Sequence, residues 1–232
     1  QLLVNVTMKK LSYIQYQMFI SCSQLSYIDA PLINSIGYNA FSSCHNFSNI
    51  SFPVLNSINS EAFESCSGIT SIDIPSLTII NDESFAYCKN LKSVSLESCT
   101  YIGVMAFYYC SKLEYIYLPN LTEISNRAFA YTSLTNIELN SLTKVTTTKY
   151  SSSGTIGDHF SNCQLLVNVT MKKLSYIQYR MFASCSQLQY VDAPCVTSIG
   201  YESFRGCNSY SNITFPVLNS ISSDSFYDNS GI

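Results

Sequence analysis

The nine residues Ile36-Gly37-Tyr38-Asn39-Ala40-Phe41-Ser42-Ser43-Cys44 contain a Phe-x-x-Cys core that returns at a fixed interval along the chain. Cysteine follows phenylalanine in eight of ten such units, and Thr132 and Asn229 replace it in the other two. A period of roughly 20 to 50 residues is typical of solenoids, in which each repeat packs on its neighbours. Phenylalanine recurs every 22 residues, apart from one longer step, at positions 19, 41, 63, 85, 107, 129, 160, 182, 204 and 226.

Each unit begins with an apolar-x-x-apolar-x-apolar stretch, as in Leu25–Ala30, and all six prolines follow such a stretch in one column. Proline cannot donate to a strand ladder, so this column marks where a short strand ends and the chain turns. Residues three apart share one face of a helical turn, so Phe41 and Cys44 are expected to enter the core together. The sequence predicts about ten turns with one parallel strand each, starting at Leu3, Leu25, Phe47, Ile69, Leu91, Leu113, Leu134, Leu166, Leu188 and Tyr210.

The period is broken in one region. One residue fewer than usual separates Thr132 from Leu134, and about ten additional residues occur within 146–158. Serine, threonine and glycine dominate this insertion, which predicts an exposed loop on one rim of the solenoid. The loop is either a tolerated surface insertion or a segment that contacts a ligand.

A longer repeat overlies the short one. Residues 1–69 recur as 164–232 with 48 of 69 positions identical. Stacking constrains only part of each turn, so this identity indicates duplication of a seven-turn block. We expect residues 1–232 to form a single solenoid segment of a longer protein, because solenoids normally carry polar caps that neither end of this sequence shows.

Composition excludes several classes of function. Charged residues make up 12% of the chain, and the net charge is −3. No basic stripe is available for a phosphate backbone, so nucleic acid is not an expected partner. No apolar run approaches the ~18–20 residues that cross a bilayer, so we expect no membrane insertion by this segment.

The cysteine column admits three interpretations. Buried free thiols that act as small apolar residues are favoured, because threonine and asparagine also occupy the column. A vertical disulfide ladder stays open, since neighbouring turns are close enough, although the stacked side chains would have to leave register. Zinc is disfavoured because an identical ladder does not converge on a tetrahedron. Cys99 is expected in the core, and Cys195 is expected to be the accessible thiol.

No catalytic or cofactor site is predicted. His45 and His159 occupy different columns about five turns apart, so no nucleophile, base and orienting group can be assembled from them. The carboxylates of the strand column are separated by hydroxyl-bearing turns, and no apolar pocket is evident to raise the pKa of one of them. We therefore expect neither an enzyme nor a metal or cofactor site in this segment.

Strand residues outside the apolar columns are expected on the open face of the sheet. One row there carries tyrosine and asparagine, and the next carries carboxylates and hydroxyls. Each residue alone is ordinary soluble strand surface, but an extended patch that combines flat aromatic area with hydrogen-bonding groups is typical of binding surfaces. The candidate ligand-binding residues are Tyr27, Asp29, Asn49, Asp73, Tyr115, Tyr117, Glu138, Tyr190 and Asp192.

The units Ser35–Cys44 and Ser198–Cys207, with their Leu-x-x-Ile-x-x-Pro-like strands, resemble the BspA-like leucine-rich repeats over nearly the whole chain. The resemblance implies a curved leucine-rich-repeat solenoid with a parallel sheet on one side and short helical or irregular turns on the other. Members of that family are mostly surface proteins, many of them linked to adhesion or host-protein binding, and they share no catalytic residues. The resemblance therefore implies a cell-surface or extracellular location.

These observations predict a non-catalytic interaction or adhesion module that binds a protein or glycan, such as one on a host surface, through its exposed sheet face. The alternative is a structural stalk or filament in which repeat blocks associate end to end.

Overall fold

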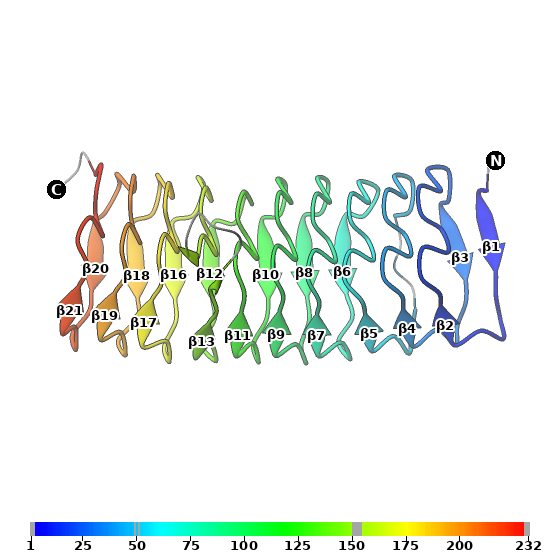
Figure 1. Cartoon of the computed structure of the whole chain (residues 1–232), viewed down its shortest axis with the longest axis horizontal. Coiled ribbons are helices and arrows are strands. Elements are labelled where there is room, and N and C mark those ends of the chain that lie inside the picture. Colours follow the sequence, from blue (N-terminus) through cyan, green and yellow to red (C-terminus); the bar gives the residue numbers. More distant parts are fainter. Residues whose placement is uncertain (1–2, 49, 51, 150–154, 230–232) are drawn as a thin grey trace.

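The computed structural model describes residues 3–48, 50, 52–149 and 155–229, and its turns stack in a nearly straight row (Figure 1). Among the described residues, each turn except the one that starts near Phe47 carries two short strands, where the sequence predicted one. The three-residue strands are β1 (Asn5–Thr7), β3 (Tyr27–Asp29), β6 (Ser71–Asp73), β8 (Ser93–Ser95), β10 (Tyr115–Tyr117), β12 (Asn136–Glu138), β16 (Asn168–Thr170), β18 (Tyr190–Asp192) and β20 (Asn212–Thr214). The expected strand that starts near Phe47 includes Asn49 and Ser51, which lie outside the described residues.

The second strand of each turn follows the proline corner and contains two residues. These strands are β2 (Tyr13–Ile14), β4 (Ser35–Ile36), β5 (Ser57–Ile58), β7 (Ile79–Ile80), β9 (Tyr101–Ile102), β11 (Glu123–Ile124), β13 (Lys144–Val145), β17 (Tyr176–Ile177), β19 (Ser198–Ile199) and β21 (Ser220–Ile221). Pairing between turns is parallel and joins equivalent columns, as in Tyr115 with Ser93 and Ser198 with Ser220. The parallel solenoid predicted from the 22-residue period is confirmed.

The phenylalanine column forms a continuous stack along the solenoid axis. Nine consecutive ring pairs, from Phe19–Phe41 to Phe204–Phe226, have centroids 5.1–5.6 Å apart and planes within 14° of parallel. The rings from Phe41 to Phe204 are fully buried. Each buried ring contributes on the order of 2–3 kcal/mol through area removed from water, and these rings are the largest side chains that the turns bury.

The turn side contains no helix within the described residues, so of the helical or irregular turns predicted there, the irregular form is the one found. Phe41 and Cys44 are both buried, but every second backbone N–H of this segment donates to the neighbouring turn, which a helix would not allow. The N–H groups of Asn39, Phe41 and Ser43 donate to carbonyls of the next turn at 3.2, 2.8 and 2.8 Å. These bonds form a third parallel ladder beside the two strand ladders.

This third ladder depends on left-handed backbone at two positions of every turn. Asn39 has φ 54° and Ser43 has φ 63°. A positive φ at the third residue of a four-residue turn is the type II geometry, which normally favours glycine or asparagine. Here the turn bonds and the inter-turn bonds together hold side chains of all kinds in it: Gln17, Ser21, Glu61, Ser65, Glu83, Tyr87, Met105, Tyr109, Arg127, Tyr131, Asp158, Asn162, Arg180, Ser184, Glu202, Asp224 and Asp228.

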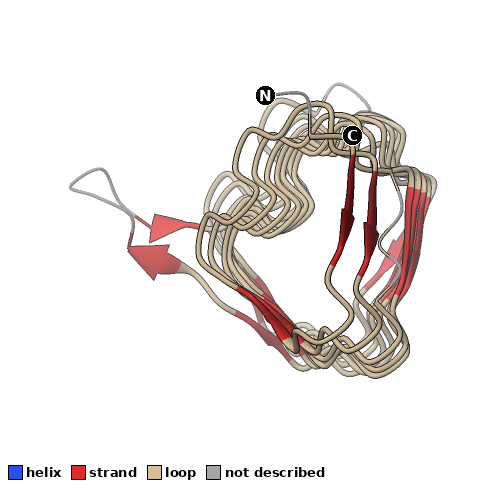
Figure 2. Ribbon diagram, turned by 90° about the vertical axis from the view of Figure 1, so that its right-hand side faces the viewer, coloured by secondary structure: helices blue, strands red, loops and turns tan. Residues whose placement is uncertain are grey.

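The three ladders also explain the shape. A leucine-rich-repeat solenoid curves when wide helices on one side oppose strands on the other. Here all three sides repeat at the strand spacing of about 4.8 Å, so no side is longer than another and the row is nearly straight, not curved (Figures 1 and 2).

The cysteines are free thiols, and eight of the ten are buried. The Sγ of Cys44 donates to the carbonyl of Phe19 in the preceding turn at 3.0 Å. At Thr132 the hydroxyl donates instead to the Phe129 carbonyl at 2.9 Å. Cys99 is buried and Cys195 is exposed, which confirms both predictions. The bond described for Cys44 recurs at 2.9–3.2 Å from Cys66, Cys88, Cys110, Cys163, Cys185 and Cys207.

The insertion projects sideways from the solenoid (Figure 2). Its described part forms an antiparallel pair of strands, β14 (Thr148–Lys149) and β15 (Thr155–Ile156), and residues 150–154 lie outside the described part. The solenoid continues past it, because β12 pairs directly with β16 and joins Asn136 to Asn168.

Candidate functional site

The open face of the three-residue strands carries the residues selected from the sequence. Tyr27, Tyr115, Tyr117 and Tyr190 are 49%, 56%, 45% and 39% exposed, which are large fractions for tyrosine in a strand. Alternation along each strand points these rings outward while the central residue enters the core. Of the other candidates, Asn49 lies outside the described residues.

Two of the candidate carboxylates are already paired. Lys9 lies 3.6 Å from Asp29, and Lys172 pairs with Asp192, the equivalent aspartate of the duplicated block. The hydrogen bond to Asp192 raises the pKa of Lys172. Because a lysine partly neutralises each aspartate, these two turns offer less free charge to a ligand than the sequence suggested.

The sheet face is interrupted between β10 and β12. From β6 to β20, every other neighbouring pair of three-residue strands is hydrogen-bonded, but these two belong to separate sheets, and they stand farther apart than their neighbours in Figure 1. The turn into β10 is closed by the Leu113 N–H, which donates to the Cys110 carbonyl at 2.9 Å. In the described chain no equivalent bond is found at Leu134, where the turn is one residue shorter. We attribute the interruption to this missing residue.

A groove of about 560 Å³ lies at the interruption. Tyr115 and Tyr117 form one wall, and Asn136 and Glu138 form the other. Ile116 lines it and is half-buried, whereas its column neighbours Val94 and Ile137 are 0% and 1% exposed. The remaining lining residues are Glu114, Leu118, Pro119, Thr135 and Asn140.

The groove is acidic, and its two carboxylates are available to a ligand. Glu114 and Glu138 are exposed, and no ion pair to either is found among the described residues. Two carboxylates, two phenolic hydroxyls and two amides converge on apolar area from Ile116 and the tyrosine rings. This combination can pair with a cation, hydrogen-bond hydroxyl groups and pack on a flat ligand surface.

The groove offers recognition groups: carboxylates, phenolic hydroxyls, amides and aromatic rings. The groove contains no histidine, cysteine or serine. No cluster of three or more metal-ligating side chains occurs in the part of the chain that the structure describes, and no helix there is long and apolar enough to cross a membrane.

The structure therefore gathers three of the nine candidates, Tyr115, Tyr117 and Glu138, into one groove. Asp73 lines a separate hollow of about 270 Å³ between Pro53 and Pro75. Sequence reasoning placed Asn136 in the row of tyrosine and asparagine but not among the nine candidates, and it did not select Glu114. It also did not recognise the missing residue after Thr132 as the origin of a groove. That deletion was the signal that could have located the site.

Comparison with known proteins relates the chain to leucine-rich repeat proteins. A family model described as a BspA type leucine rich repeat region, with six copies, matches residues 2–98, 34–157 and 143–232. A leucine-rich repeat protein from Bacteroides ovatus is 25% identical, with a TM-score of 0.68 over 97% of this chain and 70% of that chain.

Two further solved structures share the fold. A leucine rich cell surface protein from Faecalibacterium prausnitzii is 21% identical, with a TM-score of 0.56 over 98% of this chain and 91% of that chain. A leucine-rich repeat protein from T. pallidum is 19% identical, with a TM-score of 0.52 over 81% of this chain and 79% of that chain. A search of curated protein sequences finds no match to the chain.

Proposed function

Because the chain belongs to the BspA-type leucine-rich repeat family, we propose that it is a non-catalytic interaction module that binds a protein or glycan on its sheet face. The observation that carries the proposal is the groove between β10 and β12, the one interruption of the sheet face between β6 and β20. A continuous strand ladder presents only a flat surface, whereas this groove offers concave walls with aromatic and charged groups.

The free carboxylates indicate the chemistry of the partner. Glu114 and Glu138 favour a ligand that brings lysine or arginine, and the exposed Tyr115 and Tyr117 rings supply the faces on which such a cation packs. A glycan would use the same groups through its hydroxyls. The protein ligand is the better fit, because only a cation neutralises both carboxylates.

A surface or extracellular location is part of the proposal. It is supported by the family and by the cell surface protein from Faecalibacterium prausnitzii with the same fold.

The test screens the chain against a displayed random peptide library and a glycan array. Ligands that use the groove should bind Tyr115→Ala and Glu138→Gln at least about tenfold more weakly than wild type. Tyr190→Ala is the matched control, since Tyr190 occupies the same strand column outside the groove, and it should leave the affinity unchanged. Ligands that bind all three variants as well as wild type would remove the groove from the proposal.

A structural stalk is the second candidate. The block duplication supplies the matching repeats. Sedimentation over a wide concentration range tests this candidate, because end-to-end association requires a mass that grows with concentration.

A further inference from the structure

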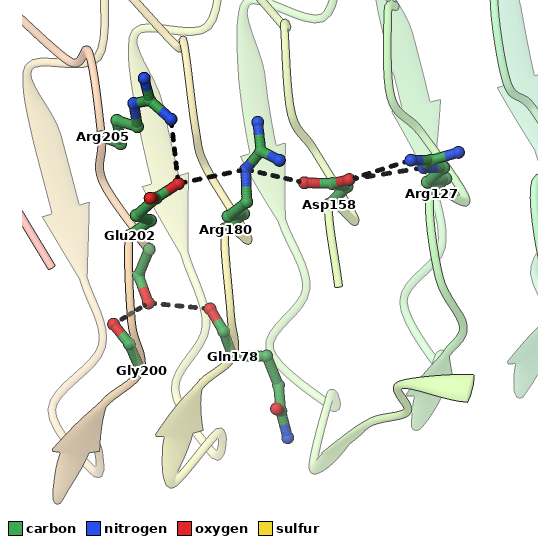
Figure 3. A network of polar contacts seen from close by, with 8 residues as sticks. Arg127, Asp158, Gln178, Arg180, Gly200, Glu202 and Arg205 are labelled. Carbon is green, nitrogen blue, oxygen red and sulfur yellow. Dashed lines mark hydrogen bonds and ion pairs between the residues drawn. The ribbon is translucent and has the colours of Figure 1, made fainter. Parts of the chain in front are cut away.

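A row of alternating charges crosses the turn side, away from the sheet-face groove. Arg127, Asp158, Arg180 and Glu202 lie in successive turns, each two residues before a stacked phenylalanine. Figure 3 shows them in one line, joined by ion pairs of 3.4, 3.5 and 3.6 Å, with Arg205 at its end. All four have positive φ, and the inter-turn ladder that holds this backbone also fixes the spacing of the charges.

Asp158 does not pair with all the N–H donors of the two arginines that flank it. The side chain of Asp158 is 8% exposed, whereas those of Arg127 and Arg180 are 37% and 36% exposed. Arg180 pairs only through Nε, and no partner for either Nη is found within the described residues. The row as a whole sets the guanidinium groups of Arg127, Arg180 and Arg205 against the carboxylates of Asp158 and Glu202, which leaves one net positive charge and free donors.

An aromatic stack ends beside these donors. Tyr87, Tyr109 and Tyr131 stack in successive turns, with centroids 6.0 and 4.5 Å apart. The next residue of this column is Asn162, so no ring in the described chain continues the stack past Tyr131. At that point lies a pocket of about 260 Å³ lined by Tyr108, Arg127, Tyr131, Ser161, Asn162 and Arg180, with Asp158 at its base.

We propose that this pocket binds one acidic sugar residue, a pyranose that carries a carboxylate or a sulfate. The apolar face of the pyranose would extend the tyrosine stack at Tyr131, and its oxyanion would accept hydrogen bonds from the Nη atoms of Arg180 and the free side of Arg127. The hydroxyl and amide groups of Tyr108, Ser161 and Asn162 suit a ligand rich in hydroxyls. The hydroxyl, amide and guanidinium groups around the Tyr131 ring favour a sugar, with its many hydroxyls, over an aromatic anion.

The duplicated block supports a specialised role for these residues. In the first copy of the block, residues 1–69, the positions equivalent to Arg180, Glu202 and Arg205 hold Gln17, Asn39 and Ser42. The same turns therefore fold there without any of the three charges. The ladder of charges is therefore not required for stacking. The pocket is also independent of the sheet-face groove, with which it shares no residue.

The test is calorimetric titration of the chain with methyl glucuronide, a methyl glucoside 6-sulfate, and neutral methyl glucoside. The acidic sugars should bind at least about tenfold more tightly than the neutral one, and the comparison between them identifies the oxyanion. Arg180→Gln should weaken binding about tenfold or more, and Tyr131→Ser several-fold. Arg205→Ser, outside the pocket, should not change it. Gln and Ser are residues that other turns hold at these positions, and thermal unfolding checks that each variant is folded.

Any of the following results would overturn the proposal. The first is equal affinity for the acidic and neutral sugars, or binding that Arg180→Gln leaves intact. The second is inorganic sulfate binding as tightly as the sulfated sugar, since the ring would then contribute nothing. The third is phenyl phosphate binding more tightly than either acidic sugar, which would assign the pocket to an aromatic anion.

Discussion

At the residue scale, the cysteine column is explained by its hydrogen bonds. A serine in this column would hold a more polar group in the core, and an alanine would remove the second donor to the phenylalanine carbonyl of the preceding turn, which also accepts from a backbone N–H. The thiol is apolar enough to be buried and still donates weakly to that carbonyl. Burial raises the pKa of Cys44 to about 12 and that of Cys99 to about 11, so the reactive thiolate is suppressed.

Thiol labelling tests this account. In the native protein, iodoacetamide should modify Cys195 first and the half-buried Cys22 more slowly, while the eight buried cysteines react only after unfolding. Mass spectrometry of the labelled protein locates the modified residues, and labelling in denaturant should give all ten. Rapid labelling of Cys88 or Cys110 in the native state would contradict the packing described for the column.

His159 predicts a dependence of stability on pH. Burial lowers its pKa from 6.5 to about 4, and its Nε2 lies 3.0 Å from the Thr146 carbonyl at the base of the inserted hairpin. Between these two pKa values the unfolded chain binds a proton that the folded chain excludes, so stability falls as pH falls. The loss is complete below about pH 4 and amounts to about 3 kcal/mol.

Denaturant unfolding at several pH values between 4 and 7 measures this contribution. His159→Ala is the matched variant, since alanine occupies the same column at Ala40, Ala62, Ala106 and Ala128. The variant should lose most of the slope between pH 4 and 6.5. An unchanged slope would assign the pH dependence to other groups.

At the element scale, the decisive feature is the short turn after Thr132. The strands on both sides of the groove are regular, and only their mutual pairing is lost. Hydrogen exchange should reveal this directly. The amide of Asn136, for which the described chain offers no inter-turn acceptor, should exchange faster than that of Tyr115, which donates to the Lys92 carbonyl at 3.2 Å. Equal protection of the two amides would mean that the ladder is closed.

The turn side shows where sequence reasoning reached its limit. The spacing of Phe41 and Cys44 correctly predicted that both are buried, but the same spacing fits a helix and a left-handed turn equally well. Positive φ at Glu83, Met105 and Tyr109 contradicts local preference. It is stabilised by bonds to neighbouring turns, which no single repeat contains, so no window of sequence could have predicted it.

At the scale of the whole molecule, the recurring columns made the solenoid predictable. A ring every 22 residues has to stack, and the nine stacked pairs confirm it. Predictions for the site succeeded less well. Alternation along the strands correctly placed Tyr115, Tyr117 and Glu138 on the open face. The groove and the charge row on the turn side, however, arise where one turn differs from its neighbours. A consensus taken over all turns does not show such differences.

The claim that recognition depends on the interrupted sheet has one direct test. Inserting a single lysine between Ser133 and Leu134 gives the turn before β12 the same length as the turn before β10, which reads Cys110-Ser111-Lys112-Leu113. The measurement is the affinity of a library-selected ligand for this variant, with protection of the Asn136 amide as the check that the ladder has closed. We predict that affinity falls at least about tenfold as the groove disappears. Unchanged affinity in a variant whose Asn136 amide has become protected would contradict the account.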